Sequence, residues 1–165
     1  MSDKLPENAP TAMGSMVNLR ANAEDTTKDK FLTFIIDDEE YGVEIAKIRE
    51  IISICKITQV PESPSYVEGI INLRGDIVPV IDVRKRFSKP WKEYDELTCI
   101  VVIEYTGYKI GLIVDSVNEV VYIHEENILP PPSSRINYYN QFIRNIGRVE
   151  EDVKLLLDLD RLLAS

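Results

Sequence analysis

Short apolar runs separated by polar turns recur along the chain from Phe31 onward. Runs of β-branched and aromatic residues between turn residues are typical of β-strands. No strand pattern alternates with a long helical one, which argues against a parallel sheet. The pattern favours an all-β fold of small antiparallel barrels or a sandwich. We expect strands at 31–37, 41–45, 46–54, 70–73, 77–81, 98–104, 108–114, 117–123, 141–146 and 153–157.

The segment 46–54 fits two structures. As a strand it supplies several isoleucines to a core, whereas the spacing of Ile45, Ile48 and Ile52 also suits one face of a helix. We favour the strand.

The stretch 66–87 is the most distinctive part of the sequence. Ile70–Leu73 and Ile77–Ile81 flank the polar turn Arg74–Gly75–Asp76. This arrangement predicts a β-hairpin that is buried on both faces, with a glycine of positive φ beside Arg74 at its tip. A turn of helix is expected just before it, at 66–68.

The two halves of the chain resemble each other. At an offset of 69 residues, Ile45, Ile48, Glu50 and Ile51 align with Val114, Val117, Glu119 and Val120. At an offset of 76, residues 80–87 align with 156–163, and Asp82 and Asp158 are each placed to cap a short helix.

The repeat predicts two similar small barrels side by side. We expect a flexible tail at 1–29 and a folded part at 30–165. Barrel one would span about 30–93 and barrel two about 94–165, with the polar segment 88–96 as the linker. Whether terminal strands are exchanged between the barrels is left open.

Composition narrows the class of protein. The chain has 165 residues and a net charge of −9, which argues against nucleic acid and anionic membrane surfaces as partners. It has no apolar run long enough to span a bilayer, and its start lacks the apolar core of a signal peptide. Cys55 and Cys99 lie in apolar runs and are expected to be reduced thiols of a cytoplasmic protein, although sequence leaves a disulfide open.

Few residues suggest catalysis. Nucleotide-binding glycine motifs are absent, and His124 is the single histidine. Asp82 and Asp158 could form a carboxylate pair in a small enzyme, but capping explains both without catalysis. We therefore expect no catalytic residue, no cofactor and no metal.

Four positions invite a binding role. The Arg74 side chain is either simply solvated at the hairpin tip, or its guanidinium donates hydrogen bonds to oxygen atoms of a partner. Ile48 and Val117 could line a groove, although core positions explain them better. Glu50 is expected on an outward strand face.

Three segments carry a resemblance: YGVEIAKIREI (41–51), VPESPSYVEGIINLRGDIVPVIDVRKRF (60–87) and GLIVDSVNEVV (111–121). They closely resemble the CheW-like family of bacterial chemotaxis coupling proteins, over about 31–163. The resemblance implies two five-stranded SH3-like barrels around a shared core. It also implies a non-enzymatic adaptor that links the cytoplasmic tip of methyl-accepting chemoreceptors to the regulatory domain of the histidine kinase CheA. Such a protein is recruited to membrane-associated arrays without entering the membrane.

Carried over by position, the resemblance implies a receptor-binding groove. In it Arg74 would bond a polar group of the receptor, and apolar residues would pack against its helix. The family often has smaller or different residues at the position of Cys99. Two alternatives of the same fold are a fragment of the kinase and a coupler–receiver fusion; the absence of ATP-binding motifs and of an acidic receiver segment argues against both. The implied receptor-binding residues are Ile48, Glu50, Gly69, Arg74, Cys99 and Val117.

Overall fold

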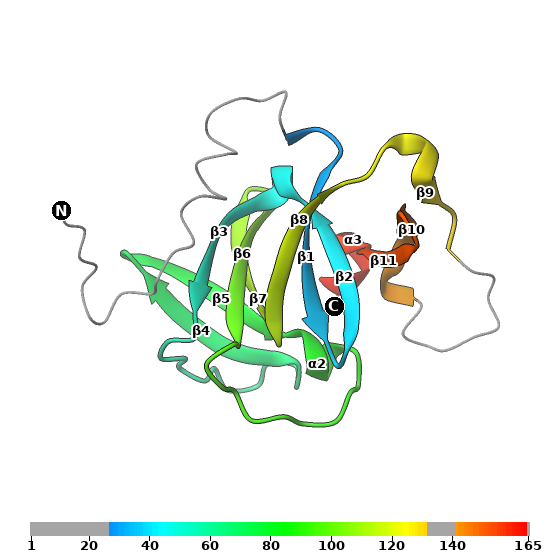
Figure 1. The fold of residues 1–165 in the computed structure, drawn as a ribbon. Helices are drawn as coiled ribbons and strands as arrows, with labels where there is room; N and C mark the ends of the chain where they lie inside the picture. Colours follow the sequence, from blue (N-terminus) through cyan, green and yellow to red (C-terminus); the bar gives the residue numbers. More distant parts are fainter. Residues whose placement is uncertain (1–26, 132–140, 165) are drawn as a thin grey trace.

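The computed structural model describes residues 27–131 and 141–164, and most of them lie in strands (Figure 1). All but three residues of the predicted N-terminal tail fall outside this range. Four short helical turns accompany the strands: η2 (Ile45–Lys47), α2 (Val83–Arg86), η3 (Glu125–Asn127) and α3 (Leu159–Leu162). The strands are β1 (Lys30–Ile36), β2 (Glu39–Glu44), β3 (Ile48–Ser53), β4 (Val67–Leu73), β5 (Asp76–Asp82), β6 (Cys99–Tyr105), β7 (Tyr108–Val114), β8 (Ser116–Tyr122), β9 (Ile128–Leu129), β10 (Ile143–Val149) and β11 (Asp152–Leu157).

The strands form two sheets, which confirms the all-β class. One sheet has six strands in the order β8-β1-β2-β11-β10-β9, and the other has five in the order β3-β6-β7-β5-β4. Each sheet contains strands from both sides of the boundary expected near residue 93. Strands are therefore shared between the two halves of the sequence, as the sequence had left open. The residue bounds of the two barrels stay a prediction.

One parallel strand contact recurs at equivalent positions of the internal repeat. Pairing of Val80 with Gly111 in the five-stranded sheet matches pairing of Leu156 with Gly42 in the six-stranded one. Both contacts are parallel and close. A Cβ atom at Gly111 would lie 2.7 Å from Val80, and one at Gly42 would lie 2.9 Å from Leu156. Glycine at these two positions lets each first-half strand approach its second-half neighbour.

Three clusters of buried side chains form the interior. The shared core combines residues of both sheets, including Phe34, Ile48 and Leu112. A second core, with Val78, Val80, Ile100 and Val102 among its members, belongs to the five-stranded sheet. A third, smaller core lies in the six-stranded sheet and contains Phe31, Val121, Ile123 and Leu156.

The two short helices are capped as predicted. The Asp82 side chain accepts a hydrogen bond from the Lys85 amide, and Asp158 accepts one from the Arg161 amide. One link between the helices was not foreseen. The Arg86 guanidinium in α2 donates to the carbonyls of Leu162, Arg161 and Ala164. Carbonyls at the end of α3 thus find donors in α2.

The structure corrects three local predictions. The hairpin β4–β5 is buried on one face only, because Ile77 is 61% exposed on the other. Residues 66–68 form no helix, because Tyr66 lies in a turn and Val67 and Glu68 already belong to β4. Segment 46–54 is a strand from Ile48, as favoured, but it follows the 3-10 turn η2.

Replacement of the capping aspartates tests their structural role. Asp158→Ala should lower the free energy of unfolding by about 1 kcal/mol, because one helix N-terminus loses its acceptor. Asp82→Ala should lower it by about 2–3 kcal/mol, because the partly buried Tyr94 hydroxyl also loses its acceptor at 2.7 Å. Urea denaturation gives both values. The matched variant Asp158→Asn should stay near wild type, and equal losses for both alanine variants would contradict the account.

Candidate functional site

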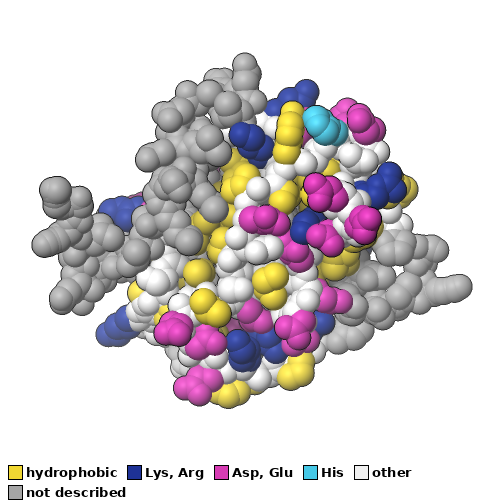
Figure 2. Space-filling model, viewed as in Figure 1, with side chains coloured by type: hydrophobic (Ala, Val, Ile, Leu, Met, Phe, Trp, Pro, Cys, Tyr) yellow, Lys and Arg dark blue, Asp and Glu magenta, His cyan; other side chains and the backbone are white. Residues whose placement is uncertain are grey.

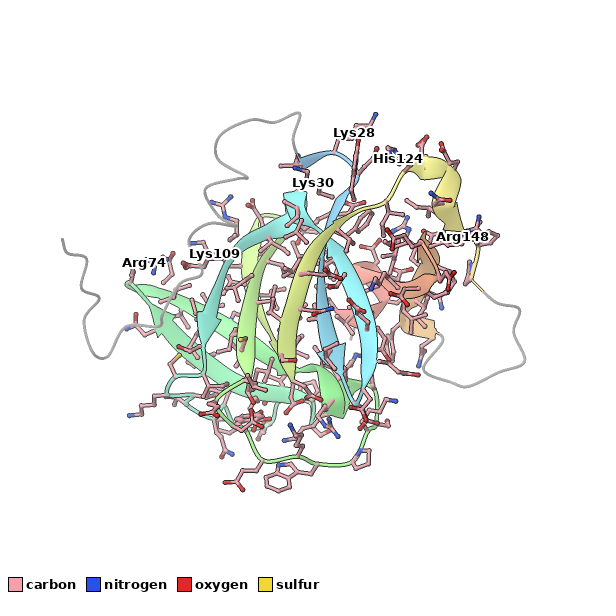
Figure 3. All side chains as sticks on the ribbon, in the orientation of Figure 1. Lys28, Lys30, Arg74, Lys109, His124 and Arg148 are labelled. Carbon is pink, nitrogen blue, oxygen red and sulfur yellow. The ribbon has the colours of Figure 1, made fainter. Side chains whose placement is uncertain are left out.

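Arg74 lies at the tip of a hairpin that extends away from the rest of the fold (Figure 3). Its φ is +52° and that of Gly75 is +93°. Positive φ at both central residues is the geometry of the two-residue turns that match the twist of a hairpin. The Asn72 side chain accepts a hydrogen bond of 2.8 Å from the Gly75 amide and fixes the turn. The arginine is thus presented on a well-defined turn.

Glu50 pairs with Arg74 across the strands. The Arg74 guanidinium donates to the Glu50 carboxylate from β3. The Arg74 side chain is 63% exposed, whereas that of Glu50 is 12% exposed. A guanidinium has five donor hydrogens, so this contact leaves others for a ligand. Glu50 therefore restricts where the Arg74 side chain points without covering it.

A bulge in β3 separates Ile48 from Glu50. The pairing with β6 shifts between them: Ile48 faces Ile103, and Glu50 faces Val102. Ile48 is only 4% exposed and belongs to the shared core, which confirms the core interpretation. Glu50 points to the other side of the sheet, as Val102 does.

Cys99 and Val117 lie at the starts of β6 and β8. Both are partly buried and pack against the shared core that contains Ile48. The Cys99 thiol is a free cysteine and lies 3.3 Å from the Leu97 carbonyl. Burial raises the pKa of this thiol, although a hydrogen bond with the Val117 backbone partly offsets the effect. The thiol stays protonated at neutral pH and acts as a small apolar surface.

Gly69 has a backbone role. Its φ is +150°, and a Cβ atom would lie 2.2 Å from the Thr58 carbonyl oxygen. Thr58 forms a bridge with Ile70 that holds the preceding loop against β4. Gly69 is itself buried, so it supports the hairpin and offers little surface to a partner.

The six residues implied by the resemblance thus divide into three places. Arg74 and Glu50 form one contact. Ile48, Cys99 and Val117 pack in or against the shared core, and Gly69 lies on β4 beneath the loop at Thr58. Sequence reasoning missed Lys109, whose ammonium lies 2.9 Å from Asp76 next to the same hairpin tip. Because β5 and β7 are far apart in sequence, no local pattern could have indicated this pair.

On the face shown in Figure 2, acidic side chains are interspersed with basic and hydrophobic ones. Within residues 27–131 and 141–164 no cluster of three metal-ligating side chains occurs. The same part of the chain has no helix long and apolar enough to cross a membrane.

Comparison with known proteins identifies the family. The family model described as CheW-like domain matches residues 30–165. The chain belongs to the CheW-like family. It is 32% identical over 153 residues to the chemotaxis protein CheW of Klebsiella aerogenes, covering 93% of this chain and 92% of the relative. It is 33% identical over 141 residues to that of Bacillus subtilis, covering 86% of this chain and 90% of the relative.

A solved structure agrees with this family. The crystal structure of the scaffolding protein TtCheW from Thermoanaerobacter tengcongensis superimposes with a TM-score of 0.76 and 37% identity. It covers 83% of this chain, and this chain covers 93% of it. The relatives of this chain are thus named as chemotaxis and scaffolding proteins rather than enzymes. This chain is an adaptor of that family.

The burial of Ile48 predicts how it responds to substitution. Ile48→Ala should lower the free energy of unfolding by about 2–4 kcal/mol, because it leaves a cavity in the shared core. Arg74→Ala should change it by less than about 1 kcal/mol, since the Arg74 side chain is largely exposed. Chemical denaturation of both variants checks the contrast. Equal losses would show that the hairpin tip supports the fold as strongly as the core does.

Proposed function

We propose that this protein couples chemoreceptors to the histidine kinase CheA in the cytoplasm and so regulates the kinase's autophosphorylation. The receptor would contact the tip of the β4–β5 hairpin, and the regulatory domain of the kinase would contact a second surface. Membership of a family of chemotaxis scaffolds supports an adaptor role. An adaptor of this kind transmits a signal by holding two partners in one geometry, so that a shift in one biases the other.

The observation that carries the receptor proposal is the exposure of Arg74 beside Glu50. Receptor tips are helical hairpins, and a polar group at such a tip would receive the remaining Arg74 donors. Val117 and Cys99, partly buried at the edge of the shared core, would pack against a receptor helix. Ile48 would support them from within the core, and Gly69 would hold the hairpin in place.

The kinase contact would use exposed apolar side chains. Ile77 in β5 is 61% exposed and Val153 in β11 is 53% exposed. They are repeat-equivalent, at an offset of 76. The resemblance implies that the kinase domain has the same fold, so barrel ends of kinase and adaptor would pack against each other.

Charge reversal at the tip tests the receptor contact. Arg74→Glu should weaken binding of a receptor cytoplasmic fragment at least tenfold, because the donors are replaced by a like-charged pair with Glu50. Affinity for the kinase regulatory domain should change less than twofold. Calorimetric titration with each partner measures both.

Lys109→Glu is the matched control, since it reverses a charge beside the same tip (Figure 3). It should reduce receptor affinity much less than Arg74→Glu does. Equal effects of the two variants would show that net charge, and not the Arg74 donors, governs receptor binding. An unchanged affinity for Arg74→Glu would remove Arg74 from the receptor site.

A further inference from the structure

An open cavity of about 400 Å³ lies at the edge of the six-stranded sheet. Buried apolar residues of three strands form much of its lining, including Phe31, Val43 and Leu157. Lys47, Arg144, Glu44 and Asp160 add charged groups. Cavities of this size are typical of ligand sites, and the accessible surface of this one is more polar than apolar.

The cavity exists because two strands separate early. In the five-stranded sheet, β5 and β7 pair through Val80–Gly111, Ile81–Leu112 and Asp82–Ile113. In the six-stranded sheet, pairing of β11 with β2 ends at Leu156–Gly42. The residues that would continue it, from Val43 and Leu157 onward, line the cavity instead. At repeat-equivalent positions, the strand pairing thus continues in the five-stranded sheet and leaves a cavity in the six-stranded sheet. We call these the closed version and the open version of the site.

The composition of the cores explains the difference. Val102 and Ile113 of the second core correspond, at an offset of 69, to Thr33 and Glu44. Val78 corresponds, at an offset of 76, to Lys154, which forms an ion pair of 2.7 Å with Glu40. Polar residues replace apolar ones at these three positions, so the third core is smaller.

The closed version is covered by the chain's own linker. Tyr94 of the segment 88–97 packs against the second core, and its hydroxyl donates to Asp82 at 2.7 Å. The Pro90 carbonyl of the same segment accepts from Arg84 at 3.0 Å. Burial and the bond to Asp82 raise the pKa of Tyr94, so its hydroxyl remains a donor.

The groups that hold the linker have counterparts at the open cavity. Asp82 and Arg84 correspond to Asp158 and Asp160. Asp160 lines the cavity and accepts a bond of 2.7 Å from Tyr105. Among the described residues, the Asp158 side chain accepts from the Arg161 amide and from no second group. Asp158 lies in sequence between the lining residues Leu157 and Leu159, next to the lining itself, and is the acceptor that corresponds to Asp82.

We infer that this cavity binds a tyrosine side chain presented by an extended segment of a partner protein. The hydroxyl would donate to Asp158, as Tyr94 does to Asp82, and the ring would cover Phe31 and Leu157. Arg144 stands where the closed version has Glu68, so an acidic residue near the tyrosine, as in the linker's own KEYDE sequence, suits the rim.

The peptide of residues 88–97 provides the probe. Titrated into the full-length protein labelled for NMR, it should cause saturable shifts in the amides of β2, β10 and α3 around the cavity. The same peptide with Tyr94→Ala should cause none. Arg144→Glu in the protein should weaken binding at least threefold, whereas Arg148→Glu, on the same strand but outside the cavity, should not.

Three results would overturn the inference. The first is the absence of saturable shifts. The second is equal binding of the alanine peptide. The third is shifts confined to β5 and the 88–97 segment, which would show that the peptide displaces its own copy from the closed site.

Discussion

The close parallel contact of strands from different halves of the sequence is the constraint on which this fold depends. Val80 meets Gly111 in one sheet, and Leu156 meets Gly42 in the other. Because each half completes a sheet begun by the other, neither half has a complete set of strands alone. The shared core then fills the space between the sheets, and its side chains come from both. Stability of the two sheets should therefore be one cooperative property.

Charged side chains reinforce this joining at the end of the fold near α2. Arg84 is largely buried and donates to Asp115 at 2.6 Å and to Asp37 at 3.1 Å. These aspartates follow β7 and β1, which belong to different sheets. Arg86 joins the ends of α2 and α3 in a similar way. The hairpin tip that carries Arg74 thus projects from a body whose two sheets are joined at several points.

Sequence reasoning reached the class of fold, most strand positions, both helix caps and the repeat, because these depend on local periodicity and turn chemistry. The parallel pairings were out of reach, since contacts such as Val80 with Gly111 join residues distant in sequence. For the same reason, the ion pair between Lys109 and Asp76 could not be predicted.

The same distinction between local and distant contacts applies to the candidate site. Arg74 at a turn was visible from its neighbours in the chain, as was Gly75. Its pairing with Glu50 was not, because the bulge in β3 decides which way Glu50 points. The spacing of Ile48 fitted both a core position and a groove position, with core the better interpretation. Only the packing of the two sheets shows that it is buried. The need for glycine at position 69 was also hidden, because the Thr58 carbonyl oxygen that leaves no room for a Cβ atom belongs to another segment.

The central claim is that one rigid body binds two partners at separate surfaces. The direct test is a calorimetric titration of the CheA regulatory domain into this protein, alone and then saturated with a receptor cytoplasmic fragment. The account predicts one-to-one binding in both cases with similar affinity. No binding at high protein concentration, or loss of kinase binding when receptor is present, would contradict it.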